Sequence, residues 1–328
     1  MNSLDRLRKI FLRSLESDFS EPEWNRQPDS LYAPQRYILG IGGKRLRPIL
    51  ALMAAESMGR NALEALPVAH AVERFHNFSL IHDDIMDEAP LRRAKETVHE
   101  KWNTNIAILS GDVLFVKAYE LICKNPPNLI PALMQVFNRT ALEVCEGQQM
   151  DMDFETRNDV TIPQYIKMIE YKTAVLIGAS LQMGAIIAEA SESCQEKIYA
   201  FGKNLGIAFQ LQDDYLDAFG NPLTFGKQVG GDIIANKKTF LYLTALQKST
   251  HSEAQELSSL FATMPKDPSD KITAVKEIFV SSGAAKATED EILRYTNTSI
   301  SLLQDIKISQ QHKDTLKSFA DFLMNRNV

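Results

Sequence analysis

Two short acidic segments with the same pattern lie far apart in the 328-residue chain. Residues 83–87 read DDIMD and residues 213–217 read DDYLD, so each has the form DDxxD. In a helix, residues four apart share a face, so the outer aspartates of each segment would point the same way and repel each other. Apolar neighbours surround both segments, which predicts a positive partner between the carboxylates. Mg²⁺ typically takes one or two carboxylates together with the phosphate oxygens of a substrate.

Basic residues accompany both acidic segments. Residues 42–48 read GGKRLRP, with three cations behind two glycines that let the backbone approach a ligand closely. Arg92 and Arg93 follow the first segment, whereas Lys227 and residues 237–238 follow the second. Arginine binds phosphate with a fork of donors, and lysine acts as a point charge. Taken singly, each acidic or basic cluster could be a solvated surface. The repeated order of carboxylates and then cations favours a site for metal and diphosphate.

Six motifs extend this pattern along the chain. In order they are GGKRLRP, SLIHDDIMDEAPLRR, GQQMD, YKTA, FQLQDDYLDAFGN and FGKQVGGDIIANKKT. Together they resemble the motifs of trans-isoprenyl diphosphate synthases, the polyprenyl synthetase family. The resemblance implies an enzyme that condenses isopentenyl diphosphate with dimethylallyl, geranyl or farnesyl diphosphate and releases diphosphate. No side-chain general base is needed, because the proton is lost to the released diphosphate.

The resemblance also implies a metal site with three Mg²⁺ ions, for which Mn²⁺ is the alternative. Such ions neutralise a leaving diphosphate and withdraw electrons from its C–O bond. Asp83, Asp87 and Asp213 are implied as ligands, and the other aspartates of the two segments as supporting or water-mediated partners. The full set is Asp83, Asp84, Asp87, Asp213, Asp214 and Asp217.

The same resemblance assigns the substrate-binding residues. The residues implied for the allylic diphosphate are Arg92, Lys172, Lys227 and Lys237. Those implied for isopentenyl diphosphate are Lys44, Arg47, His76 and Arg93. The oxygens of Thr173 and Gln210 are expected to stabilise the carbocation, and Lys172 to add positive charge where negative charge develops. Gln148 and Asp151 either support the site or have a structural role.

Product length is expected to depend on side chains one or more helical turns before Asp83. Phe78 lies five residues earlier, a rise of about 7.5 Å along a helix, and Ser79 lies four earlier. A phenyl ring there would form a floor for the growing tail, although ordinary core packing explains Phe78 equally well. The resemblance favours short C15 or C20 products and leans towards C20, because one of the two positions is aromatic. Phe115 and Tyr119 would supply a deeper floor.

Apolar periodicity predicts an almost entirely helical chain. Pro67 fits the first turn of a long helix that ends before Pro90. Further helices are expected over residues 105–124, 131–153, 163–190 and 196–217, with an amphipathic one near the N-terminus. No stretch alternates like strands joined by hairpin turns. We expect one all-α domain over residues 1–328 with helices around a central cavity, and the resemblance implies a homodimer.

Composition argues against several other classes. The net charge of −6 lacks the electrostatic footprint of a nucleic-acid-binding protein. The first 21 residues mix acids with cations and contain no long apolar run, unlike a signal peptide or a membrane-spanning segment. The three cysteines, an odd number without CxxC spacing, indicate reduced thiols in a cytoplasmic protein. We expect them to pack as small buried hydrophobes.

Rival classes leave motifs unexplained. The pair His82 and Asp83 is typical of helical metal phosphohydrolases, but that class accounts for neither the second acidic segment nor the arginines. A terpene cyclase would keep the metal motifs without needing Lys44, Arg47 or Arg93. A helical scaffold or an inactive regulatory subunit should have lost acidic segments that this chain keeps. A synthase of longer polyprenyl chains is the alternative nearest to the favoured interpretation.

Overall fold

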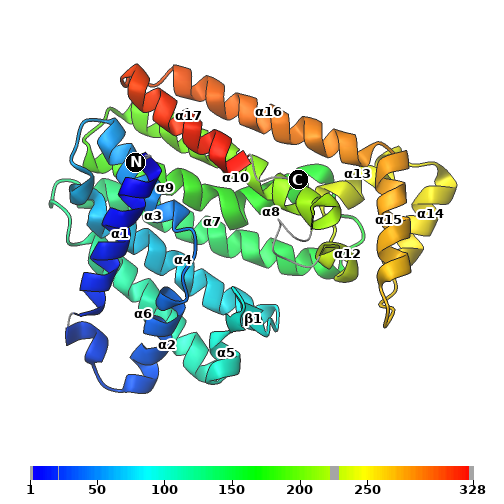
Figure 1. Ribbon diagram of the computed structural model, residues 1–328, viewed down its shortest axis with the longest axis horizontal. Coiled ribbons are helices and arrows are strands. Elements are labelled where there is room, and N and C mark those ends of the chain that lie inside the picture. The colour runs from blue at the N-terminus through cyan, green and yellow to red at the C-terminus, as the bar shows by residue number, and fades with distance from the viewer. Residues whose placement is uncertain (1–2, 21, 222–228, 325–328) are drawn as a thin grey trace. The chain divides into compact units, whose positions relative to one another are not determined.

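The structure, a computed structural model, describes residues 3–20, 22–221 and 229–324. Regular structure in these residues is helical apart from one antiparallel hairpin, in which β1 (Leu91–Arg92) pairs with β2 (Lys95–Glu96) (Figure 1). The all-α prediction is therefore confirmed, with this small hairpin as an addition that the sequence pattern did not indicate. Two residues per strand are too few to produce a recognisable alternation.

The chain divides into two compact units. The first consists of residues Met1–Arg139, Ala179–Tyr199 and Lys307–His312, and the second of Thr140–Gly178, Ala200–Ile306 and Lys313–Val328. Helices that contribute residues to both are α7 (Ile130–Thr156), α9 (Val175–Ile187), α10 (Glu192–Phe219) and α17 (Gln310–Met324). A single domain over the whole chain stays a prediction.

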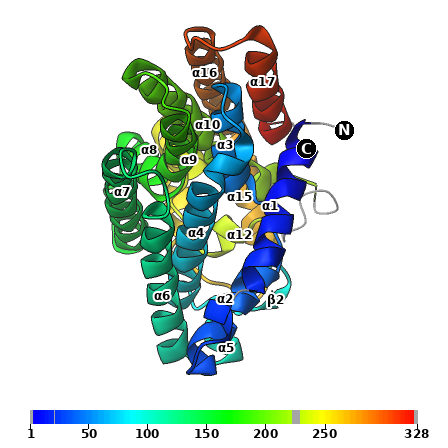
Figure 2. The same cartoon turned by 90° about the vertical axis from the view of Figure 1, so that its left-hand side faces the viewer.

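The first unit is built around two long helices that lie side by side, α4 (Leu66–Met86) and α6 (Thr104–Ile122) (Figures 1 and 2). Among the described helix pairs, this one packs most extensively. The other elements within the unit are α1 (Ser3–Phe19), η1 (Pro22–Asn25), α2 (Asp29–Gly40), α3 (Leu46–Ser57), η2 (Ala62–Ala65) and α5 (Val98–Lys101).

Local sequence explains where α4 and α6 begin and end. Pro67 occupies the first turn of α4, where a missing N–H costs nothing, so this prediction is confirmed. The helix ends at Met86, and Glu88 then adopts a positive φ of 48° before the hairpin. Asn103 caps α6 by accepting a hydrogen bond from the Ile106 backbone N–H. These ends leave the first acidic segment on the last turn of α4.

The second unit has its own apolar core, formed by residues such as Tyr165, Leu211, Phe240 and Phe279. Its remaining elements are α8 (Ile162–Ile169), η3 (Glu170–Ala174), α12 (Gly231–Ile234), α13 (Phe240–Lys248), α14 (His251–Leu260), α15 (Ser269–Ser281) and α16 (Ala284–Gln304). The second acidic segment lies near the end of α10, after which the Gly220 N–H donates to the Leu216 carbonyl oxygen.

One predicted helix contains a turn that the sequence pattern did not indicate. Residues 163–190 were expected to form a single helix, and α8, η3 and α9 follow one another without a break over residues 162–187, but η3 is a π-helical turn. Glycines face this turn from two neighbouring helices. A Cβ atom at Gly147 would overlap the Lys172 backbone nitrogen, and one at Gly206 would lie 2.7 Å from the Ala174 Cα. The wide turn therefore fits because two facing side chains are absent, which apolar periodicity does not reveal.

The cysteine prediction also needs correction. Cys123 and Cys145 are exposed and Cys194 is half-buried, so none is a buried hydrophobe, although all three thiols are free. Cys123 caps the C-terminus of α6, where a helix end meets solvent. In the described residues, no helix combines the length and the apolar character that crossing a bilayer requires.

Candidate active site

The first acidic segment divides its aspartates between two environments. Asp84 is only 1% exposed, and both of its carboxylate oxygens accept hydrogen bonds from the Arg92 Nε, at 2.7 and 2.8 Å. Asp83 is 20% exposed and lies 3.5 Å from the same guanidinium, whereas Asp87 is exposed at the end of α4. Burial opposes the charge of Arg92, but the hydrogen bond and charge of Asp84 outweigh it and raise the pKa of Arg92. Asp84 is thus a structural anchor, and Asp83 and Asp87 lie on the more open side.

A cluster of cations lies near His76 in the same unit. The Arg47 guanidinium is 3.2 Å from the His76 Nε2, and Arg93 donates a hydrogen bond to the Gly42 carbonyl oxygen. Burial, followed by the charges of Arg47, Arg93 and other arginines, lowers the pKa of His76 well below its usual range. Burial also lowers the pKa of Arg47, to about 10. Concentrated positive charge of this kind suits an anionic ligand.

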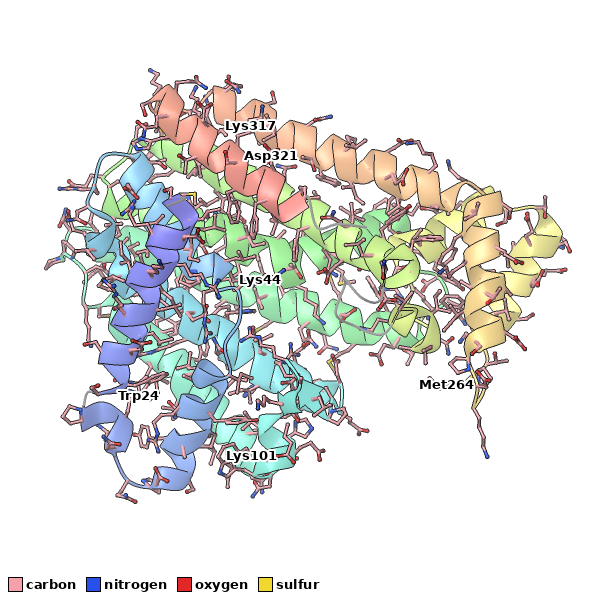
Figure 3. All side chains as sticks on the ribbon, in the orientation of Figure 1. Trp24, Lys44, Lys101, Met264, Lys317 and Asp321 are labelled. Carbon is pink, nitrogen blue, oxygen red and sulfur yellow. The ribbon has the colours of Figure 1, made fainter. Side chains whose placement is uncertain are left out.

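The tautomer of His76 follows from its partner. Arginine only donates hydrogen bonds, so the His76 Nε2 must accept from Arg47 and the neutral ring carries its proton on Nδ1. That leaves an N–H on the other edge of the ring as a donor. Lys44 is exposed just before α3, where Figure 3 labels it. Four of the residues predicted for isopentenyl diphosphate therefore belong to one unit.

Arg45 has a different role from its two cationic neighbours. Its side chain is buried and forms an ion pair with Glu73 in α4, and it also donates to the Leu39 carbonyl oxygen. The residue adopts a left-handed conformation, with φ of 54°. Gly43 has φ of +126°, and a Cβ atom there would lie 2.6 Å from the Arg93 guanidinium carbon. The glycine and the buried ion pair together hold the loop that presents Lys44 and Arg47.

Aromatic side chains lie at the contact between α4 and α6. Phe78 stacks on Phe115 with a centroid distance of 4.8 Å and an angle of 9° between the rings. Phe115 also contacts Tyr119 at 5.3 Å, and Tyr119 contacts Phe137 at 4.9 Å. Ser79 turns its hydroxyl to the His76 carbonyl oxygen. The structure thus brings the predicted length-determining aromatics into one cluster, to which Phe137 is an unpredicted addition.

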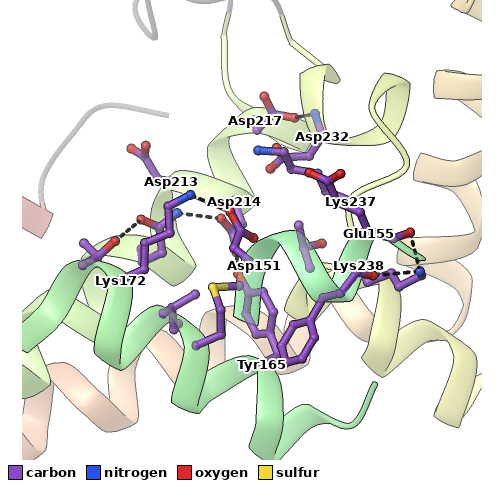
Figure 4. Close-up of a pocket in the computed structure, with 16 residues that line it drawn as sticks. Asp151, Glu155, Tyr165, Lys172, Asp213, Asp214, Asp217, Asp232, Lys237 and Lys238 are labelled. Atoms are coloured by element: carbon purple, nitrogen blue, oxygen red, sulfur yellow. Dashed lines mark hydrogen bonds and ion pairs between the residues drawn. The ribbon is translucent and has the colours of Figure 1, made fainter. Parts of the chain in front are cut away.

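The second acidic segment repeats the buried middle aspartate. Asp214 is 5% exposed, and it accepts hydrogen bonds from the Tyr165 hydroxyl and, at 3.0 Å, from the Gln210 amide. Burial and then the charge of Asp232 raise the pKa of Asp214 well above its usual range despite these donors. Asp213 points in another direction in Figure 4. A cation bound nearby would stabilise the charged form of Asp214 in this environment.

Asp217 contacts the beginning of α12 through its side chain and its backbone. Its Oδ2 accepts a hydrogen bond of 2.9 Å from the Asp232 backbone N–H in the first turn of α12. Gly230 has φ of +85° and donates its own N–H to the Asp217 carbonyl oxygen. The side chain of Asp217 therefore contacts the first turn of α12, and its supporting role at a metal site stays a prediction.

The π-helical turn presents Lys172 and Thr173 to the cavity that the second acidic segment also lines. Lys172 Nζ is 2.5 Å from Asp151 Oδ2, and the Thr173 hydroxyl is 3.3 Å from the Gln210 side-chain oxygen (Figure 4). These side chains line a cavity of about 210 Å³ within the second unit. Its polar lining consists of Asp151, Glu155, Tyr165, Lys172, Thr173, Gln210, Asp213, Asp214, Asp217, Asp232, Lys237, Lys238 and Thr239.

Comparison with known families decides the classification. A family model described as polyprenyl synthetase matches residues 28–278. The chain belongs to the polyprenyl synthetase family. Members of this family join isopentenyl diphosphate to an allylic diphosphate and are generally Mg²⁺-dependent.

Individual relatives agree with this assignment. The chain is 35% identical over 328 residues to the short chain isoprenyl diphosphate synthase of Methanothermobacter thermautotrophicus, covering 99% of each chain. It is 44% identical over 224 residues to the geranylgeranyl diphosphate synthase of Methanosarcina mazei, or 68% of this chain and 69% of the relative. A crystal structure of geranylgeranyl pyrophosphate synthase matches with a TM-score of 0.94 and 51% identity over 100% of both chains.

This polyprenyl synthetase is therefore a prenyltransferase with the all-α isoprenoid synthase fold, and the family resemblance seen in its motifs is confirmed. The relatives named above are diphosphate synthases, so the phosphohydrolase, cyclase and scaffold interpretations lose their support. The assignment of individual site residues stays a prediction, and Lys227 lies outside the described residues.

Two residues of this synthetase were missed by sequence reasoning. The Tyr165 hydroxyl donates to Asp214, and the Asp232 backbone N–H donates to Asp217. Lys238, noted in the sequence only as one of the cations after the second acidic segment, donates to the Phe154 and Glu155 carbonyl oxygens at 2.9 and 3.0 Å. Asp232 follows two glycines, a signal that could have indicated a loop near a ligand. Tyr165 has no such signal, because it reads as an ordinary apolar position of a helix.

Proposed function

We propose that this chain makes a short-chain prenyl diphosphate, with geranylgeranyl diphosphate (C20) as the favoured product, from isopentenyl diphosphate and an allylic diphosphate. The observation that carries the proposal is that the aspartates of both acidic segments lie in two different environments. Each has a buried middle aspartate held by donors and an outer aspartate on a more open side. A merely solvated acidic turn has no reason to fix one carboxylate and leave its neighbours accessible.

The donor set suits Mg²⁺. Asp83, Asp87 and Asp213 offer carboxylate oxygens, the ligands that hard divalent cations prefer. Within the part of the chain that the structure describes, no three His, Cys, Asp or Glu side chains converge as a metal site. Ions held by either acidic segment would accordingly take further oxygens from water or from the diphosphate. When bound, three such ions would neutralise the leaving diphosphate and polarise its C–O bond.

Protein cations would then bind the two substrates separately. Isopentenyl diphosphate would contact Lys44, Arg47, Arg93 and the Nδ1–H of His76, a combination supported by the density of positive charge around that ring. The allylic diphosphate would contact Lys172, Lys237 and Lys227, with Arg92 acting mainly through Asp84. Its ion pair leaves Arg92 less available to a substrate than Arg93 is.

The carbocation would form beside Thr173 and Gln210. Their oxygens lie 3.3 Å apart, and the Gln210 amide donates to Asp214, which aims its carbonyl oxygen away from that aspartate. Oxygen dipoles fixed in this way stabilise developing positive charge without supplying a base. Lys172 would add charge near the diphosphate, and Asp151 would hold its ammonium group in place.

The C20 assignment rests on the Phe78–Phe115 stack. Two stacked rings between α4 and α6 would block a growing prenyl tail more firmly than one ring would. Ser79, at the neighbouring position, leaves room for part of a tail. Similarity to two geranylgeranyl diphosphate synthases supports the same length. By family expectation the enzyme acts as a cytoplasmic homodimer of single-domain chains.

The direct test is product analysis. The purified chain is incubated with Mg²⁺, isopentenyl diphosphate and each of the three allylic diphosphates, and dephosphorylated products are separated by chromatography. We expect C20 alcohol as the main product and no elongation after chelation of the metal. Predominant products beyond C25 would favour a longer-chain synthase, and the absence of any condensation would contradict the proposed function.

A further inference from the structure

His82 has a contact that the proposed mechanism does not use. It lies in α4 directly before Asp83, and its ring rests on Gly111 of α6. A Cβ atom at Gly111 would come within 2.5 Å of the His82 Nε2 and 2.7 Å of its Cδ2. That Nε2 donates a hydrogen bond of 3.2 Å to the Ile108 carbonyl oxygen, and it is 3.7 Å from Asp112 Oδ1. The Nε2–Cδ2 edge of the imidazole is thus held against α6, where any side chain at position 111 would displace it.

The neighbouring turn repeats the same pairing. Phe78 is four residues before His82, and Phe115 is four residues after Gly111, so each pair shares one helix face. Phe78 stacks on Phe115, and the His82 ring meets Phe78 edge-on at a centroid distance of 4.7 Å and an angle of 63°. The two helices are therefore joined by two successive contacts, one aromatic and one between a ring and a glycine.

We infer that His82 is a positioning residue that sets product length. Resting on the proposed function, this inference states that the His82–Gly111 contact fixes the register of α4 on α6. That register determines where Phe115 of α6 lies relative to Phe78 and Asp83, which are both on α4. Removing the imidazole withdraws the edge-on support of Phe78, which can then tilt into the vacated space. The floor below Asp83 opens, and the prenyl tail grows further before it is blocked.

A double-mutant cycle tests this contact. His82→Ala is expected to lengthen the main product by at least one isoprene unit, as Phe78→Ala should do by removing the floor itself. Gly111→Ala forces a methyl group against the imidazole, and we expect it to reduce kcat by about tenfold or more, because small displacements of reacting groups have large effects. In the His82→Ala background the same methyl group has room. There, Gly111→Ala should change neither product length nor kcat.

Gly40→Ala provides the matched control, because a Cβ atom at this helical glycine would meet nothing within 4 Å. Circular dichroism and thermal unfolding show whether each variant is folded. The inference is supported if His82→Ala lengthens the product and the Gly111→Ala effect disappears in the double variant. It is overturned if folded His82→Ala gives the wild-type product length, or if the two effects simply add. A wild-type chain that elongates no primer would instead refute the proposed function.

Discussion

The first and middle aspartates of each acidic segment should respond differently to substitution. Asp84 is buried with two oxygens on Arg92, whereas Asp83 is partly exposed. Asp84→Asn removes the charge that pairs with the part-exposed Arg92 guanidinium and can turn an amide N–H₂ towards it, and we expect a loss of about 1–3 kcal/mol in the free energy of unfolding. Asp83→Asn should leave this free energy within about 0.5 kcal/mol of wild type.

Turnover should show the complementary pattern. Asp83→Asn is expected to lower kcat by a factor of about a hundred to a thousand, the size found when one electrostatic partner of a transition state is removed. Urea unfolding and steady-state kinetics on both variants measure the two effects. Equal destabilisation by the two substitutions would contradict the division of roles between these aspartates.

The two arginines that follow the first segment offer a second comparison. Arg93 is exposed and bound to the Gly42 carbonyl oxygen, whereas Arg92 is committed to Asp84. We expect Arg93→Ala to raise the KM for isopentenyl diphosphate about tenfold or more, with little change in the KM for the allylic substrate. Arg92→Ala should mainly lower stability and kcat. Initial-rate kinetics with each substrate varied in turn measure both KM values. Equal changes in the two KM values for Arg93→Ala would contradict this assignment.

Sequence alone could predict residue types and spacing at the site, but not which side chains are committed to each other. Asp83 and Asp84 look equivalent in the sequence. Their difference depends on the turn after α4, where Glu88 has a positive φ and the Ala89 N–H donates to the Asp84 carbonyl oxygen, so that Arg92 in β1 reaches the Asp84 side chain. Similarly, Arg45 resembled its neighbours until its ion pair with Glu73 was seen. Contacts of this kind depend on the tertiary fold and leave no local pattern.

At the scale of elements, the π-helical turn depends on close backbone packing. Gly147→Ala would push a methyl group into the Lys172 backbone nitrogen and displace the turn that presents Lys172 and Thr173. We expect kcat to fall about tenfold or more and stability to fall by about 1–3 kcal/mol. Gly40→Ala is again the control, since its Cβ atom meets no neighbour. Wild-type kinetics for Gly147→Ala would show that the position of the turn does not matter for catalysis.

The docking of α1 on α4 should depend on pH through His70. This ring is 7% exposed, lies 2.8 Å from the Ser14 hydroxyl and is 5.0 Å from the Phe11 ring. Burial lowers the pKa of His70 to about 4. In the unfolded chain its pKa is about 6.5, so between these values the unfolded state binds the extra proton.

Stability contributed by the neutral ring is therefore fully present above about pH 6.5 and is lost as the pH falls towards about 4. Between about pH 7.5 and about pH 5, wild type should lose about 2 kcal/mol more than His70→Gln. Urea unfolding at both pH values measures the difference, and subtracting the variant removes the contribution of other titrating groups. Equal losses of unfolding free energy in wild type and His70→Gln would mean that protonation of His70 does not destabilise the fold.

Helix positions were largely predictable, because prolines, caps and apolar periodicity are local signals. The expected helix over residues 105–124 corresponds to α6 (Thr104–Ile122), and the one over 196–217 lies inside α10. The π turn was not predictable, since residues 163–190 keep their apolar character through it. What permits it is the pair Gly147 and Gly206, on two other helices. A single sequence does not show that such distant positions face one another.

At the scale of the whole molecule, we propose that a second copy associates with the outer face of α6. Leu109 is 57% exposed and Val116 is 56% exposed, and their seven-residue spacing places them on one face of the helix. Fully burying such a side chain contributes about 1.5–3 kcal/mol. In a two-fold interface each residue occurs twice, so its contribution is doubled.

We therefore expect the wild-type chain to sediment as a dimer at micromolar concentration and Leu109→Glu/Val116→Glu to sediment as a monomer. Met264→Glu is the control, because this residue is 76% exposed in the loop after α14 and far along the chain from α6 (Figure 3). The inner face of the same helix carries Gly111 and Phe115, so release of a partner should also loosen the floor beneath Asp83. The monomeric variant should then yield longer or more mixed products than the dimer. If the wild type is a monomer and still makes a single C20 product, product length does not depend on dimer formation.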